Sequence, residues 1–394
     1  MKSKKLGFYI LGLFFSVVIF AFGLGLAELT GFLLLKFQIP LPFIASSPKL
    51  ESKSPTSEMR FKIKSNVDSH VKYANKLNIV DITLFNLGQT WLPSHMKNGL
   101  QINQPNIQME AIAKWKTRGE PVYKIKLQTD EVGRRLTPEL QTSIFKSRHL
   151  IFMGCSYTFG EGIDQYETIP YNTAKNSAKD YKAYNLGLSG GSPDETLAAI
   201  TRADFLEKIP EKNGIAVYTF IDGQILRTVG DYRLVAKWIK ARPLTEKNSA
   251  GQWVAERTWS QAFPVRVLLS NIAAKSYVLK WLKFMWPIPK EADFQKLAEI
   301  LNEIKKEYHK KFGAKNRFVV MFFFEFGKFS QNIIPYLEKY EIEYLDYSTV
   351  NLGTLVDKDP YILNHPSAAA TSVIGQILAE DLGLKSQSET VSNF

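Results

Sequence analysis

The chain has 394 residues, of which 45% are hydrophobic and 13% aromatic, and this is enough apolar material to bury the core of a large folded protein. Its formal net charge is +12, but the basic residues are scattered and no nucleic-acid recognition motif accompanies them. We therefore expect no nucleic-acid partner. The single cysteine, Cys155, excludes an internal disulfide and a cysteine-based zinc cluster, and we expect neither a metal nor a cofactor.

The N-terminus has the pattern of a membrane anchor. Three lysines in residues 1–5 precede 22 uncharged residues, Leu6 to Ala27, and apolar residues resume at 31–35. About 20 apolar residues cross a bilayer, and lysines before the span favour a cytoplasmic N-terminus. We predict cytoplasmic residues 1–5, one transmembrane signal-anchor at 6–35 in the inner (cytoplasmic) membrane, and an extracytoplasmic remainder, periplasmic in a Gram-negative cell. A signal peptide cleaved after Gly25-Leu26-Ala27 is the alternative.

Three further segments lie outside the main domain. Residues 45–58 are rich in Ser, Pro and charged residues, which is typical of a linker, and we place the linker at 36–58. Alternating stretches such as 122–127 indicate half-exposed strands, so we expect a small β-rich extracytoplasmic segment at 59–145. Residues 385–394 are polar and are predicted to form a flexible tail.

Residues 146–384 alternate between strand and helix signals. Unbroken apolar runs, as at 318–324, are typical of strands covered on both faces, and alternating elements predict an α/β fold with a doubly wound parallel sheet. The predicted strands are 150–153, 183–188, 214–221, 317–324 and 343–347. The predicted helices are 193–208, 225–241, 291–312, 329–340 and 366–383.

Residues 229–290 fit this alternation poorly and hold five of the seven tryptophans, so we interpret them as an insertion. The aromatic rings could line a lid or a wall for substrate, sugar rings included. Alternatively, they pack an inserted helical subdomain or rest against the membrane surface.

Ser156 is the candidate nucleophile. The apolar run from Leu150 to Met153 stops at Gly154-Cys155-Ser156, which places the serine at the carboxyl end of a strand, where open α/β sheets bind ligands. A strand that simply ends in a glycine turn is the alternative. Serine needs a base, and of the five histidines His365 opens the last predicted helix, where an added positive charge is disfavoured. A near-neutral imidazole can accept a proton, although an ordinary helix cap would have the same sequence.

Two further loops are predicted at the same edge of the sheet. Glycines 187, 190 and 191 stand where the chain leaves the second strand, and backbone N–H groups there could bind an oxyanion. The third strand ends in the polar residues Asp222 and Gln224.

In this order, the serine loop, the glycine loop, the polar loop and the late His-Pro resemble the SGNH, or GDSL-like, hydrolases over residues 146–384. The resemblance implies a flavodoxin-like three-layer sandwich. It also implies that Ser156 is the nucleophile, that Gly190 belongs to the oxyanion hole and that His365 is the base.

The chain departs from the family pattern at three places. Cys155 replaces the aspartate before the serine, and a lone buried cysteine is usually a packing residue. No asparagine follows the third strand, so Gln224 is the candidate for the other oxyanion donor, because an ionised Asp222 can only accept hydrogen bonds. Ile362 stands where the family has the aspartate that orients the base. Asp359 is the candidate in its place, and Asp357 or a Ser-His dyad are the alternatives.

We therefore expect a membrane-anchored, extracytoplasmic SGNH-like serine esterase or acyltransferase. The resemblance and the predicted location suggest an acylated, in particular acetylated, glycan of the cell envelope as substrate. The alternative is a catalytically impaired SGNH-like protein that binds glycans or has a structural role in the envelope.

Overall fold

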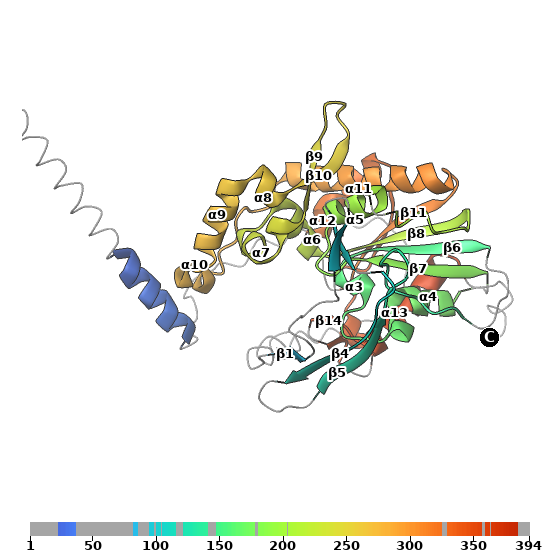
Figure 1. Cartoon of the computed structure of the whole chain (residues 1–394), viewed down its shortest axis with the longest axis horizontal. Helices are drawn as coiled ribbons and strands as arrows, with labels where there is room; N and C mark the ends of the chain where they lie inside the picture. The colour runs from blue at the N-terminus through green and yellow to red at the C-terminus, as the bar shows by residue number, and fades with distance from the viewer. Residues whose placement is uncertain are drawn as a thin grey trace, which may run out of the picture. The chain divides into compact units, whose positions relative to one another are not determined.

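The computed structural model describes the chain with gaps (Figure 1). The predicted linker 36–58 apart from Lys36, the predicted tail 385–394, residues 1–22 and Asp357 lie outside the described residues. The described residues are 23–36, 82–85, 94–97, 100–103, 105–115, 121–140, 147–177, 180–202, 204–324, 329–356, 359–362 and 364–384.

A five-stranded parallel sheet forms the centre of the fold, with the order β12-β11-β8-β6-β7. Numbered along the chain, this is the flavodoxin-like order 2-1-3-4-5, so the predicted doubly wound α/β fold is confirmed. The order reverses between β6 and β8, and ligands bind at such a switch point, outside the carboxyl ends of the strands. The strands are β6 (Arg148–Gly154), β7 (Tyr181–Gly187), β8 (Asn213–Phe220), β11 (Arg317–Phe322) and β12 (Glu343–Asp346).

Helices cover both faces of this sheet (Figure 1). Alternate residues of β6 belong to two apolar clusters: Ile151 and Met153 pack on one face, and Leu150 and Phe152 pack on the other. This alternation explains why the strands read as unbroken apolar runs. The first face is covered by α5 (Pro193–Arg202), α6 (Asp222–Val229), α11 (Glu291–Phe312) and α12 (Ser330–Lys339). The second is covered by α4 (Ile169–Lys175) and α13 (Ala368–Asp381).

The prediction of one helix at 225–241 was wrong. The segment forms α6, α7 (Tyr232–Lys237) and the short η2 (Ile239–Ala241). Gly230 ends α6 with a φ of 71°, and a Cβ there would lie 2.3 Å from the ring of Trp259. Asp231 then caps α7 by accepting a hydrogen bond from the N–H of Arg233.

Two other predicted helices differ at their ends. The predicted helix 193–208 stops at Arg202, and the predicted helix 366–383 starts at Ala368. The second difference arises because His365 and Pro366 form the short strand β14 (His365–Pro366), which pairs with β13 (Tyr361–Ile362).

The residues before the main domain contain short antiparallel strands. β1 (Ile82–Phe85), β4 (Gln108–Trp115) and β5 (Pro121–Gln128) form one sheet, and β2 (Ser94–Lys97) pairs with β3 (Leu100–Asn103). Ile125 and Leu127 of β5 pack against Phe159, which lies just after the strand that ends at Gly154. The upstream strands therefore contact the region of Ser156.

The tryptophan-rich insertion is not purely helical. A hairpin of β9 (Pro243–Lys247) and β10 (Trp253–Thr258) precedes α8 (Trp259–Ala262), α9 (Pro264–Ala273) and α10 (Tyr277–Trp281). Trp259 is buried, and the indole N–H of Trp253 donates to Glu299 of α11 at 2.8 Å. These two rings pack the insertion.

The chain divides into two compact units, residues 1–81 with 271–285, and residues 82–270 with 286–394. Within the first unit, a helix at 23–36 contacts the start of α10. No helix among the described residues is both long enough and apolar enough to cross a membrane.

Candidate active site

Ser156 lies at the carboxyl end of β6, beside the switch point of the sheet. The strand ends at Gly154, whose φ is 140°, and a Cβ there would lie 2.7 Å from the side chain of Thr158 and 2.8 Å from the carbonyl of Thr219. Glycine at 154 therefore lets the chain turn sharply into the short helix α3 (Ser156–Phe159). Ser156 is the first residue of that helix and is 4% exposed.

The structure brings Ser156 and His365 together across 209 residues of sequence: Ser156 Oγ lies 2.9 Å from His365 Nε2. His365 is held in the hairpin β13–β14, where it pairs with Ile362. Tyr157 of α3 supports this hairpin, because its hydroxyl donates to the carbonyl of Asn364 at 2.6 Å. The Tyr157 ring also lies 5.4 Å from the His365 ring.

Glu161 is the acidic residue that the sequence analysis missed. Its Oε2 lies 2.9 Å from His365 Nε2, and its Oε1 accepts a hydrogen bond from the hydroxyl of Ser189. The carboxylate thus contacts the same ring nitrogen as the serine, so it does not occupy the place of an acid at Nδ1. What it can do is stabilise the positive charge that appears when Nε2 takes a proton.

Asp359 lies where the chain enters the hairpin that carries His365. It is exposed, and its Oδ1 accepts a hydrogen bond from the N–H of Tyr361 at 3.1 Å. Its proposed role as the orienting acid stays a prediction.

The glycine-rich turn lies beside the end of β6, just before Ser156. The N–H of Leu188 donates to the carbonyl of Gly154 at 3.0 Å, and Gly190 has a left-handed φ of 69°. Arg227 from α6 fixes the turn by donating to the carbonyl of Gly191 at 2.5 Å. The place of Gly190 in an oxyanion hole stays a prediction.

Glu195 of α5 also holds this turn, and it forms an ion pair with Arg242 of the insertion. Glu195 accepts from Arg242 at 2.6 Å and from the N–H of Ser192 at 3.1 Å. Burial raises the pKa of the Glu195 carboxyl, and Arg242 opposes that shift. The insertion therefore helps to shape the loop beside Ser156.

Gln224 and Cys155 are both fully buried. Gln224 lies in α6, and its Nε2 donates to the carbonyl of Thr219 at 3.1 Å. Its Oε1 is buried without a hydrogen-bond partner among the described residues. Cys155 packs in the apolar cluster on the α4 and α13 face of the sheet, which suits a packing residue.

Arg135 fixes the loop that carries Glu161. The residue is 1% exposed, and its guanidinium donates to the carbonyls of Phe159 at 2.8 Å, Gly160, and Ile163 at 2.7 Å. Burial lowers the pKa of Arg135 to about 10, and nearby carboxylates, Glu161 among them, oppose the shift. The side chain therefore stays charged at neutral pH and binds three carbonyl oxygens at once.

Tyr123 of β5 completes the surroundings of Glu161. Burial, together with the charge of Glu161, raises the pKa of the Tyr123 phenol to about 12. Neither Tyr123 nor Arg135 follows the serine in sequence, so no local motif could have assigned them to this site. For Glu161 a signal existed, since it stands between two glycines five residues after Ser156.

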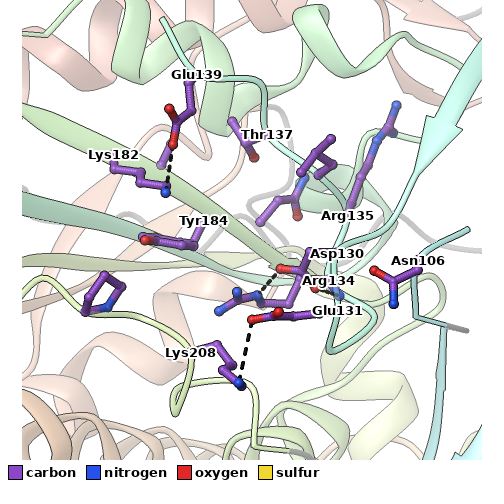
Figure 2. A pocket seen from close by; sticks show the side chains of 14 residues that line it. Asn106, Asp130, Glu131, Arg134, Arg135, Thr137, Glu139, Lys182, Tyr184 and Lys208 are labelled. Carbon is purple, nitrogen blue, oxygen red and sulfur yellow. Dashed lines mark hydrogen bonds and ion pairs between the residues drawn. The ribbon is translucent and has the colours of Figure 1, made fainter. Parts of the chain in front are cut away.

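A separate pocket of about 420 Å³ lies along the edge strand β7. Its lining includes Arg135 and other residues of the segment before the main domain. Figure 2 shows three ion pairs within it: Arg134 with Asp130, Lys182 with Glu139, and Lys208 with Glu131. Its lining includes neither Ser156 nor His365, and six of its charged side chains form these three ion pairs.

The site combines a serine hydroxyl, an imidazole within hydrogen-bond reach and a carboxylate on that imidazole, which is the equipment for nucleophilic acyl transfer. Among the described residues, no group of three or more His, Cys, Asp or Glu side chains could hold a metal ion.

No protein-family model and no curated protein matches the chain. Among solved structures, the chain is similar to a lipolytic protein of the G-D-S-L family from Veillonella parvula, at 8% identity over 59% of this chain and 97% of that chain, with a TM-score of 0.34. It is also similar to an acetyl xylan esterase from Butyrivibrio proteoclasticus, at 11% identity over 62% of this chain and 65% of that chain, with a TM-score of 0.37. A third similar structure is a carbohydrate acetylesterase from Sinorhizobium meliloti, at 10% identity over 60% of this chain and 98% of that chain, with a TM-score of 0.33. At such low identities and TM-scores, the likeness assigns neither an activity nor a residue role.

Proposed function

We propose that the chain is a serine ester hydrolase or acyltransferase of the SGNH type, with Ser156 as nucleophile and His365 as base. The observation that carries the proposal is the 2.9 Å contact between Ser156 Oγ and His365 Nε2 at the switch point of a parallel sheet. A serine and a histidine from distant parts of the sequence meet where this fold binds ligands.

In the first step Ser156 Oγ attacks the ester carbonyl and His365 Nε2 takes the hydroxyl proton. The imidazolium then lies against Glu161 Oε2, 2.9 Å from Nε2, which stabilises the new charge. The oxyanion is bound by the backbone N–H of Ser156, which as the first residue of α3 has no partner within the helix, and by that of Gly190. The alcohol leaves with the proton from Nε2, and Ser156 keeps the acyl group.

In the second step a hydroxyl group attacks the acyl-enzyme. His365 Nε2 takes its proton and returns a proton to Ser156 Oγ as the ester bond to the serine breaks. If the attacking group is water, the product is a free acid. If it is a sugar hydroxyl, the enzyme is an acyltransferase.

The substrate we propose is an acetylated glycan of the cell envelope. The acetyl part and the glycan part of the proposal both rest on the motif resemblance. The glycan part also rests on the predicted anchor at 6–35, which would tether the catalytic unit outside the cytoplasmic membrane.

The test is hydrolysis of p-nitrophenyl acetate by the purified full chain and by Ser156→Ala. We expect the variant to lose at least about 10³-fold in kcat, as serine hydrolases do when the nucleophile is removed. Ser260→Ala is the matched control, because Ser260 is exposed and lies on α8.

Labelling by a fluorophosphonate separates the enzyme from an impaired binding protein. The proposal requires the label on Ser156, identified by peptide mass, and no label in Ser156→Ala. An intact, folded chain that hydrolyses no ester and takes no label would overturn the enzymatic function and favour glycan binding.

A further inference from the structure

One face of α9 is apolar and exposed. Val265, Leu268, Leu269 and Ile272 follow the spacing i, i+3, i+4, i+7, and their exposed fractions lie between 53% and 69%. This spacing places all four side chains on one stripe of the helix. An aliphatic stripe exposed to this degree is unusual on a soluble protein, where exposed apolar residues are normally scattered.

The opposite face of α9 is fixed to the protein. Arg266 donates to the carbonyls of Val229 at 2.7 Å and Gly230 at 2.8 Å, and its guanidinium lies 5.0 Å from the ring of Trp259. Ser270, one turn further on, is 1% exposed. The helix is therefore held in one orientation, with its aliphatic stripe directed away from the residues that hold it.

Along the sequence, the segment that contains this stripe carries only basic charges. Residues 257–290 contain six basic residues and no Asp or Glu. Four lysines of this range are exposed, at positions 275, 280, 283 and 290. An apolar stripe flanked by basic residues and by Trp, Tyr and Phe is the pattern of a helix that lies in the plane of a membrane interface, and lysines favour anionic lipid.

A second observation connects this region to the predicted anchor. Three residues after the end of α9, Ser276 and the N–H groups of Tyr277 and Val278 donate to the carboxylate of Glu28. The ring of Phe32 lies 5.1 Å from that of Tyr277 in an edge-to-face contact. Glu28 and Phe32 belong to the predicted span 6–35, so the chain just after α9 contacts the segment expected at the membrane.

We propose that the aliphatic stripe of α9 inserts into the surface of a bilayer that contains anionic phospholipid. Insertion covers Val265, Leu268, Leu269 and Ile272, and the neighbouring lysines bind lipid phosphates. The catalytic unit is then held against the membrane by two attachments, the anchor and this helix. A protein partner on the same stripe is the competing occupant, and the test distinguishes the two.

The experiment places an environment-sensitive NBD fluorophore on the full chain through Leu268→Cys. The native Cys155 is buried, and labelling of the parent chain checks that it does not react. Asn332→Cys, on an exposed position of α12, is the matched control. The labelled proteins are reconstituted into vesicles of phosphatidylcholine and phosphatidylglycerol, with or without lipid that carries a nitroxide quencher in its acyl chain.

We expect the probe at position 268 to shift to shorter wavelength and to lose most of its emission to the quencher, while the probe at 332 does neither. The quenching at 268 should weaken in vesicles of phosphatidylcholine alone. A probe at 268 that stays in water overturns the proposal. So does a probe that is shielded from water but not quenched, because a protein would then cover the stripe. Ester hydrolysis in detergent does not depend on this contact, so the two proposals can fail separately.

Discussion

Replacement of Glu161 by glutamine tests whether the carboxylate that lies against His365 contributes to the proposed activity. In the native chain, Glu161 Oε2 lies 2.9 Å from His365 Nε2. The substitution keeps the size of the side chain and removes its charge. Opposite charges whose centres lie about 4 Å apart attract by about 4 kcal/mol at an effective dielectric constant of about 20. Both side chains are 22% exposed, so solvent screening reduces the effect to about 2 kcal/mol, which corresponds to about a 30-fold loss of kcat.

The assay is steady-state hydrolysis of p-nitrophenyl acetate. Because the imidazolium forms only after binding, KM should stay nearly constant while kcat falls. Glu131→Gln is the matched control, since that carboxylate is 58% exposed and pairs with Lys208 in the separate pocket. A folded Glu161→Gln chain with unchanged kcat would refute the reasoning. If Asp359→Asn alone abolished turnover, Asp359 would be the orienting acid.

Three further substitutions test the supports of the site and of the core. Arg135→Lys keeps the charge but loses the planar guanidinium that reaches three carbonyls. The free energy of unfolding, measured with urea, should therefore fall by about 2 kcal/mol. Tyr157→Phe removes the hydrogen bond to the carbonyl of Asn364, which contributes about 1 kcal/mol, and should lower kcat about fivefold at constant KM. An unchanged kcat would exclude a role of Tyr157 in positioning His365. Burial lowers the pKa of His149, so below about pH 6.5 the unfolded chain binds a proton at this residue more readily than the folded chain does. The free energy of unfolding should therefore decrease as the pH falls below about 6.5. In His149→Gln the melting temperature should fall less steeply over that range, and an equal slope would assign the acid sensitivity to other groups.

The sheet was predictable because its strands are buried on both faces and therefore carry continuous apolar runs. The helix α11 lies at the predicted 291–312, since its pattern is long and has no internal glycine or proline. The hairpin β9–β10 was missed. Its turn depends on Asn248, whose side chain accepts hydrogen bonds from the N–H groups of Ala250 and Gln252. An Asn-Ser-Ala-Gly turn is visible in the sequence at 248–251, but the segment was interpreted from its tryptophans instead.

Within the site, the sequence was sufficient for the residues that stand at strand and helix ends. Ser156 could be selected because it follows a strand, at the edge where open α/β sheets bind ligands. His365 could be selected because it stands just before the last predicted helix, and the structure places its Nε2 2.9 Å from Ser156 Oγ. Glu161 was harder, because its contact with His365 depends on how the loop after α3 turns. That turn is set by Arg135, which belongs to the segment expected to be a separate β-rich unit.

The guanidinium of Arg135 also bears on where a self-sufficient catalytic fragment begins. A fragment cut at residue 146 would contain Ser156, His365 and Glu161. It would also leave the carbonyls of Phe159 and Ile163 facing a space that an arginine fills in the intact chain, and it would expose the side of Phe159 that β5 covers. Truncation there removes the donors without removing the acceptors, which is the costlier way to break a buried hydrogen bond. Arg135 and β5 are thus part of the framework that holds Ser156, Glu161 and His365 in place, and changes to this upstream segment should alter the proposed activity without replacing any reacting group.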